Sequence, residues 1–315
     1  MEKRNLGRTN LQVYPITLGG NVFGWTIDQA QSFEILDGFL EAGFNFIDTA
    51  DSYSHWVAEN KGGESETIIG NWIKDRKNRD QIIISTKVGS VPKTDKKSLA
   101  PEYITKAIED SLKRLKTDYI DLYQSHFDDL STPIEATLQT YEKLINAGKV
   151  RWIGASNFSI ERLTESLEIA DNNNLPRYQT LQPEYNLYKR EQYEKEYEQI
   201  IIDNHLGVLN YYALASGFLT GKYRSEADLG KSKRGGGMKS YLNERGFRIL
   251  DALDQVAEQY SATPATIALA WLIARPSVTA PIASVTNLDQ LDELQKAANL
   301  KLKPEHIAIL NEASK

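Results

Sequence analysis

Short apolar runs alternate along the chain with longer segments whose apolar positions recur every three or four residues. The run 15–19 precedes the segment 29–42, and the run 44–48 precedes 64–74. Apolar runs bounded by turn residues predict buried strands, and the 3.6-residue spacing predicts amphipathic helices. The same order repeats at 81–87 with 101–115, 119–124 with 132–147, 150–154 with 160–170, 178–182 with 190–204, 207–211 with 243–260, and 279–283 with 288–298. A further helix is predicted over 263–274, with Pro264 in its first turn.

Eight strand–helix repeats without an intervening linker predict one (β/α)8, or TIM, barrel over residues 1–315. Parallel strands need crossover helices, and closing the sheet removes its exposed edges. An open doubly wound sheet with a second domain is the alternative, but that fold usually has fewer strands and a glycine-rich turn after its first strand. Before the first strand, the turn Gly7-Arg8-Thr9-Asn10 lies between apolar positions within 4–13 and predicts a β-hairpin that caps the barrel floor.

Composition and charge narrow the class of partner. The 315 residues are 41% hydrophobic and 25% charged, which is typical of a globular protein. The net charge of −6, without any basic and aromatic cluster, argues against a nucleic-acid partner. The absence of cysteine excludes disulfides, thiolate nucleophiles and cysteine-ligated metals, so redox chemistry would need a bound cofactor.

Neither export nor membrane insertion is expected from the sequence. The N-terminal residues are polar and lack the apolar segment of a signal peptide. The longest uncharged stretch that could suggest a membrane span, 260–274, is shorter than the ~20 residues that span a bilayer. We therefore expect a soluble, cytoplasmic protein without a membrane partner, whose oligomeric state the sequence does not indicate.

Polar side chains follow three neighbouring predicted strands. Asp48 ends the second strand and Tyr53 lies in the loop after it, Lys87 ends the third, and His126 follows the fourth. Each alone has an ordinary structural explanation, such as an ion pair, a solvated cation or a packed ring. Because the C-terminal strand ends of a barrel share one rim, we expect them to meet there. Together they provide a proton donor, a cation beside it, an anion to hold that cation and a second donor, which is a set suited to acid catalysis.

The sequence resembles the aldo-keto reductase family over nearly its whole length. The segments that carry the resemblance are Asp48-Thr49-Ala50-Asp51-Ser52-Tyr53, Gly63-Glu64-Ser65-Glu66, Ser85-Thr86-Lys87-Val88-Gly89, Tyr123-Gln124-Ser125-His126, Gly154-Ala155-Ser156-Asn157-Phe158, Gln182-Pro183-Glu184-Tyr185-Asn186 and the stretch 214–223. The resemblance implies an oxidoreductase that reduces an aldehyde or ketone with a hydride from NAD(P)H, or oxidises the alcohol in reverse. It also implies that Asp48, Tyr53, Lys87 and His126 form the catalytic tetrad.

In this interpretation Tyr53 is the general acid, and the Lys87 ammonium makes it a stronger acid by lowering its pKa from ~10. Asp48 keeps Lys87 charged and oriented, and His126 hydrogen-bonds the substrate oxygen. Positioned proton transfer of this kind typically contributes ~10²–10⁴ in rate. No metal is expected, because the histidines show no ligand spacing.

The resemblance also implies a cofactor site without a Rossmann unit, since no GxGxxG motif follows a strand. Ser156, Asn157 and Gln182 are expected to hold the nicotinamide carboxamide, and Tyr211 to stack on the ring. A glycine-containing turn with Leu214, Ser216, Gly217, Leu219, Gly221 and Lys222 is expected at the pyrophosphate, and Ser284, Thr286 and Gln290 at the adenosine.

Two departures from the family pattern bear on the details of this site. Tyr212-Ala213 replaces a common Ser-Pro, which leaves the local loop path open. The segment 284–290 lacks the Lys or Arg with which many relatives pair the 2′-phosphate, so we expect NADPH to be preferred only modestly over NADH. The loop 223–240 is equally consistent with a lid over the cofactor and with a solvated loop.

The substrate wall is predicted from residues that follow strand ends. Asn21, Phe23, Trp25, Trp56 and Phe127 would form an apolar surface for the aldehyde or ketone, without identifying the compound. Two other functions remain as alternatives. A cofactor-sensing regulatory or binding subunit would keep the dinucleotide site, and a hydrolase or isomerase would use Asp48 or Asp51 as a base.

Overall fold

The computed structural model describes residues 1–315 and contains one sheet of eight parallel strands. Their order is β10-β3-β4-β5-β6-β7-β8-β9. The sheet closes between its two ends, because the carbonyl of Val208 accepts the backbone N–H groups of Thr279 and Ala280 at 3.0 and 3.1 Å. The strands are β3 (Thr17–Gly19), β4 (Phe46–Asp48), β5 (Ile83–Val88), β6 (Ile120–Ser125), β7 (Val150–Ser156), β8 (Thr180–Gln182), β9 (Gly207–Val208) and β10 (Ile282–Ala283).

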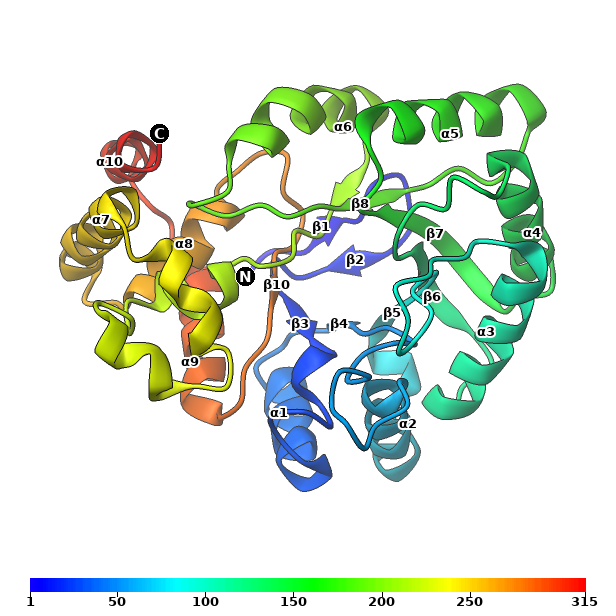
Figure 1. Cartoon of the computed structure of the whole chain (residues 1–315), viewed down its shortest axis with the longest axis horizontal. Helices are drawn as coiled ribbons and strands as arrows, with labels where there is room; N and C mark the ends of the chain where they lie inside the picture. Colours follow the sequence, from blue (N-terminus) through cyan, green and yellow to red (C-terminus); the bar gives the residue numbers. More distant parts are fainter.

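The helices surround this sheet (Figure 1), which confirms the predicted (β/α)8 barrel. Side-chain caps explain several helix starts: Asp28 accepts from Gln31 at the start of α1, and Thr263 accepts from Thr266 at the start of α8. The helices are α1 (Gln29–Glu41), α2 (Glu64–Arg76), α3 (Pro101–Leu115), α4 (Ile134–Asn146), α5 (Ile160–Asn173), α6 (Glu198–Asn204), α7 (Glu244–Tyr260), α8 (Pro264–Ile273), α9 (Leu288–Asn299) and α10 (Pro304–Ala313).

Several elements differ from the sequence prediction, and the predicted strand 279–283, for example, is shortened to β10. The predicted helix 190–204 contains a π-helical turn at Tyr193–Tyr197 before α6. The predicted strand 207–211 is shortened to two residues, although Leu209 and Tyr211 still donate to β8 and its following residue. Helix α10 was not predicted, yet Pro304 at its first position is a recognisable helix start.

The N-terminal hairpin closes the floor of the barrel, as predicted. Strands β1 (Arg4–Asn5) and β2 (Gln12–Val13) are antiparallel. At Gly7, with φ of +60°, the hairpin backbone packs closely against the barrel, since a Cβ there would lie 2.3 Å from the carbonyl oxygen of Gln179. The hairpin and the barrel interior share one buried apolar cluster, formed by Leu6, Leu11, Val13, Phe46, Leu122, Leu209 and Ala280.

Leu6→Ala is expected to lower the free energy of unfolding by ~2–5 kcal/mol, because it leaves a cavity in this floor cluster. Chemical denaturation at constant m-value measures the change. Leu130→Ala is the matched control, since the Leu130 side chain is 81% exposed and its loss should be nearly neutral. Equal stability of the two variants would show that the hairpin is not part of the folded core.

Strand register brings the polar residues to one level of the barrel. Asp48 on β4 pairs with Ser85 on β5, and Lys87 on β5 pairs with Gln124 on β6. Gln124 in turn pairs with Gly154 on β7. Because alternate residues of a strand point to opposite faces, these side chains meet inside the barrel near the C-terminal strand ends.

Candidate active site

The centre of the site is the fully buried ammonium of Lys87. Its Nζ donates to Oδ2 of Asp48 at 2.6 Å, to the carbonyl oxygen of Thr49 at 2.8 Å and to Oη of Tyr53 at 2.9 Å. All three hydrogens of the ammonium therefore have acceptors, which fixes its direction. Burial lowers the pKa of Lys87, and the Asp48 carboxylate in contact with it opposes that shift.

The pKa of Tyr53 differs from the sequence expectation. Burial, followed by the nearby Asp48 carboxylate, raises the pKa of Tyr53 well above its usual value, so the expected lowering by Lys87 is wrong for the protein without cofactor. The hydroxyl also lies 3.4 Å from Oδ2 of Asp48, to which it donates. The phenol consequently stays protonated at neutral pH and has a proton to give.

The ring of His126 packs edge-on against that of Tyr53, with 6.0 Å between the two ring centroids. Burial, followed by the charge of Lys87, lowers the pKa of His126 well below its usual value, so the imidazole is neutral at neutral pH. Its ring stacks on Phe127 at 4.8 Å, and its buried Nδ1 has no protein partner. A neutral imidazole in this position has one N–H available for a ligand oxygen.

The tetrad side chains surround one end of a cavity of about 940 Å³, with Tyr53 and His126 on its wall and Lys87 buried behind Tyr53. The cavity takes in most of the residues predicted to bind cofactor or substrate. Those lining it are Asn21, Trp56, Phe127, Ser156, Asn157, Gln182, Tyr211, Leu214, Ser216, Gly217, Lys222, Ser284, Thr286 and Gln290.

Four predicted binding residues do not line this cavity. Phe23 and Leu219 are fully buried in the core, which corrects the prediction that they face a ligand. Trp25 lies behind the wall, where Trp56 packs edge-on against it at 5.4 Å between centroids. Gly221, with φ of +77°, ends the turn that begins at Ala215. Earlier residues of this turn line the cavity, but Gly221 does not.

Asp51, the alternative base considered for a hydrolase, is buried and also lies outside the cavity. Burial, followed by the charge of Glu66, raises the pKa of Asp51 well above its usual value. Asp51 therefore does not face a ligand in the cavity, whereas Asp48, the other base of that alternative, lines the cavity and is bound to the Lys87 ammonium.

Polar groups beside the tetrad form the surface expected to hold the carboxamide. Ser156 Oγ donates to the carbonyl oxygen of Gln182 at 2.9 Å and accepts from Asn157 at 3.1 Å. The hydroxyl of Tyr211 donates to Oδ1 of Asn157 at 2.9 Å, which fixes the ring at the cavity wall. Asn157 itself has φ of +55°, a left-handed conformation that asparagine tolerates better than most residues.

A cluster of backbone and cationic groups lies further along the cavity. Ala215, Ser216 and Gly217 have successive φ values of +47°, +57° and +106°, so the chain makes a tight left-handed turn here, within which the N–H groups of Ala215 and Gly217 donate to the carbonyl oxygens of Tyr212 and Leu214. The first turn of α8 lines the same region, and Lys222 and Arg234 add positive charge. This donor set fits a pyrophosphate.

The loop 223–240 is folded over the cavity edge in this structure. Ser232, Lys233 and Arg234 line the cavity. The guanidinium of Arg234 lies 5.0 Å from the ring centroid of Trp25, and Lys233 Nζ donates to the Trp25 carbonyl oxygen at 3.0 Å. The Nη2 atom of Arg234 is buried and has no hydrogen-bond partner within the protein.

The far end of the cavity lacks a basic side chain. Ser284 Oγ donates to Oδ1 of Asn21 at 2.6 Å, and Gln290 Oε1 accepts from the backbone N–H of Thr286 at 2.9 Å. Glu293 also lines this end and was missed from the sequence, although it lies one helical turn after Gln290 on α9. A carboxylate here does not favour an extra phosphate.

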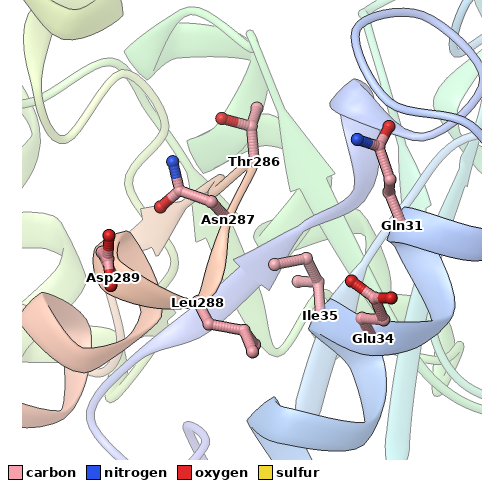
Figure 2. A pocket seen from close by; sticks show the side chains of 7 residues that line it. All are labelled: Gln31, Glu34, Ile35, Thr286, Asn287, Leu288 and Asp289. Atoms are coloured by element: carbon pink, nitrogen blue, oxygen red, sulfur yellow. The ribbon is translucent and has the colours of Figure 1, made fainter.

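A smaller hollow of about 280 Å³ adjoins this end, between α1 and the start of α9 (Figure 2). Thr286 lines both cavities. The remaining side chains of the hollow come from the two elements, and they are Gln31, Glu34, Ile35, Asn287, Leu288 and Asp289.

Comparison with known proteins shows the family of this chain. The model of the Aldo/keto reductase family matches residues 15–315. The chain belongs to the aldo/keto reductase family. This aldo/keto reductase is 34% identical to the uncharacterized oxidoreductase YrpG of Bacillus subtilis (strain 168), over 99% of this chain and 95% of that protein.

Two further relatives show how differently members are described. The aldo-keto reductase YhdN of Bacillus subtilis (strain 168) is 32% identical, over 97% of this chain and 91% of that protein. A probable voltage-gated potassium channel subunit beta of Arabidopsis thaliana is also 32% identical, over 95% of this chain and 92% of that protein. None of the helices of this aldo/keto reductase combines the length and apolar character needed to cross a membrane.

Proposed function

We propose that this protein, acting as one barrel domain, reduces an aldehyde or ketone to the alcohol with NADPH or NADH. The observation that carries the proposal is the buried Lys87 ammonium, which contacts Asp48 at 2.6 Å and Tyr53 at 2.9 Å at the end of a large cavity. When bound, the reduced nicotinamide supplies a hydride to the carbonyl carbon. All other roles below belong to side chains of this chain.

Tyr53 gives its proton to the substrate oxygen as the carbonyl π electrons move onto that oxygen. The phenolate left behind accepts a hydrogen bond from Lys87, whose charge is held in place by Asp48, and it regains a proton from solvent. The neutral imidazole of His126 donates a hydrogen bond that orients the carbonyl. Lys87 thus acts on the phenolate that forms rather than on the resting phenol, whose pKa is raised.

The cofactor assignment follows the positions of the polar groups along the cavity. Ser156, Asn157 and Gln182 would hold the carboxamide, and the ring of Tyr211 would cover one face of the nicotinamide. The turn around Ser216 and Gly217 would receive the pyrophosphate, with Lys222 supplying charge, and Ser284, Thr286 and Gln290 would contact the adenosine.

NADPH and NADH should be used with similar efficiency, because Glu293 and the absence of a basic residue leave a 2′-phosphate without a strong partner. We expect kcat/KM for the two cofactors to differ by no more than about tenfold, or ~1.4 kcal/mol. Steady-state assays with one aldehyde and both reduced dinucleotides measure this ratio. A preference of about a thousandfold, ~4.1 kcal/mol, would show that another group, such as Arg234, reads the phosphate.

Turnover of a panel of aldehydes and ketones tests the function itself. Trp56 and Tyr212 are large aromatic side chains, 45% and 48% exposed, at the cavity wall. With Phe127 they form an apolar wall that favours substrates with an apolar or aromatic body. Oxidation of NADPH that depends on the added carbonyl compound supports the reductase. Tight dinucleotide binding without any turnover would favour the regulatory subunit instead.

A further inference from the structure

The second oxygen of the Asp48 carboxylate is held by two glutamine side chains. Oδ2 contacts Lys87, whereas Oδ1 accepts from Nε2 of Gln182 at 3.0 Å and from Nε2 of Gln124 at 3.4 Å. The carboxylate is therefore fixed from both sides. The donors on Oδ1 oppose rotation of the carboxylate about its Cβ–Cγ bond, which the contacts of Oδ2 with Lys87 and Tyr53 alone would restrain less.

Gln124 is built into the barrel interior rather than into the ligand cavity. Its side chain is fully buried and does not line the cavity, unlike that of Gln182. Its Nε2 donates to Ser85 Oγ at 2.7 Å as well as to Asp48, so one amide nitrogen joins β4 and β5. Gly154 on β7 lies beside this side chain, and a Cβ there would meet Oγ1 of Thr180 at 2.1 Å before it met Gln124 at 3.2 Å.

The surroundings of the Gln124 amide do not satisfy all of its hydrogen-bonding groups. Oε1 of Gln124 is buried and has no hydrogen-bond partner, and the nearby Oγ1 of Thr180 is also unpartnered. An apolar residue of similar volume would avoid leaving such an oxygen unsatisfied. What glutamine offers here, and an apolar residue would not, is the pair of hydrogen bonds from Nε2 to Asp48 and Ser85.

We propose that Gln124 is a positioning residue for carbonyl reduction, which holds the Asp48 carboxylate so that Oδ2 remains on Lys87. The proposal rests on the function proposed above. Gln182 shares the contact with Asp48 but is also assigned to the cofactor, whereas Gln124 serves Asp48 whether or not a cofactor is bound. Through Asp48 and Lys87, Gln124 sets the pH range in which the Tyr53 phenolate is stabilised.

The surroundings of Lys87 determine the sign of the expected pH effect. Lys87 is surrounded by β4, the loop after β4, α2 and the residue after β6. The titratable groups of these elements that act on its ammonium are Asp48, Asp51, Tyr53, Glu66 and His126. Removing the Gln124 amide loosens Asp48 and should lower the pKa of Lys87 further. Adding a carboxylate at position 124 should favour the ammonium and raise that pKa.

The variants Gln124→Leu and Gln124→Glu test the proposal through the pH profile of kcat/KM. In Q124L we expect kcat to fall by about 10–100-fold, with cofactor affinity changed less than about twofold. The alkaline limb should move down by about one pH unit in Q124L and up by about one pH unit in Q124E. If Gln124 had a purely structural role, both substitutions would lower the free energy of unfolding, and the alkaline limb would not move in opposite directions in the two variants.

Gln179→Leu is the matched control, because Gln179 directly precedes β8, at the end of that strand away from Gln182, and its side chain donates only to the Arg177 carbonyl oxygen. Its profile should equal that of the parent. A crystal structure of Q124L supplies a second readout, in which we expect the Asp48 carboxylate to be rotated and its contact with Lys87 lengthened.

Parental pH limbs in both Gln124 variants, or an unchanged Asp48–Lys87 contact in the Q124L crystal, would overturn the role of Gln124 while leaving the reductase function standing. A parent protein that reduces no carbonyl compound would instead refute the proposed function. In that case the crystal structure still decides whether Gln124 positions Asp48.

Discussion

Tyr53→Phe should nearly abolish carbonyl reduction and leave cofactor binding almost unchanged. The phenol is the only proton donor of the site in contact with the Lys87 ammonium, at 2.9 Å, and phenylalanine keeps the ring while removing the hydroxyl. We expect kcat to fall by ~10²–10⁴, which is the usual contribution of a positioned proton donor. Single-turnover oxidation of NADPH with a saturating aldehyde gives the rate directly.

Dinucleotide binding, followed by fluorescence, supplies the control for this variant. The affinity should stay within about twofold of the parent, since uniform binding is unaffected when only a transition-state contact is lost. A Y53F protein that reduces aldehydes at the parental rate would remove Tyr53 from the mechanism. Equal losses of binding and rate would indicate damage to the cavity rather than loss of an acid.

Lys87→Met should have the largest effect on stability. Lys87 and Asp48 are both essentially inaccessible to solvent, so methionine leaves a carboxylate buried without its cation. Removing one partner of a buried pair typically costs ~3–5 kcal/mol. We expect a loss of this size in the free energy of unfolding, measured by chemical denaturation, together with loss of turnover.

The double variant Lys87→Met with Asp48→Asn separates the two effects. Neutralising Asp48 removes the unpaired charge, so part of the lost stability should return while turnover stays absent. A K87M protein as stable as the parent would mean that the Asp48 carboxylate does not depend on Lys87 to balance its charge. Recovery of activity in the double variant would contradict the role of the ammonium.

The sequence was sufficient for the features that depend on local periodicity and strand ends. Strand–helix alternation predicted the barrel, and the position of Asp48, Lys87 and His126 at successive strand ends predicted that they would meet. The first turn at Gly7 likewise predicted the floor hairpin. These features follow from short-range patterns, because a barrel places every C-terminal strand end on one rim.

Features that depend on closure of the barrel could not be predicted in the same way. Phe23 follows a strand end like the residues that line the cavity, but the chain folds it into the core, where it is fully buried. The raised pKa of Tyr53 arises from burial by segments distant in sequence. The role inferred for Gln124 requires the register with Gly154 and Lys87, which no single segment contains.

Family membership does not by itself decide between catalysis and regulation. The relatives include proteins named as oxidoreductases and as potassium channel subunits. One fold supports both descriptions, so the assignment depends on the chemistry at the cavity end. Here that end holds a protonated phenol, a paired ammonium and a neutral imidazole around one cavity.

Transfer of deuterium from NADPH labelled at both C4 positions tests this account most directly. With a reducible aldehyde, the parent protein should yield an alcohol that carries one deuterium on the former carbonyl carbon, and Y53F should yield almost none in the same time. Unlabelled alcohol, or no alcohol from any carbonyl compound despite tight NADPH binding, would contradict carbonyl reduction by hydride transfer at this site.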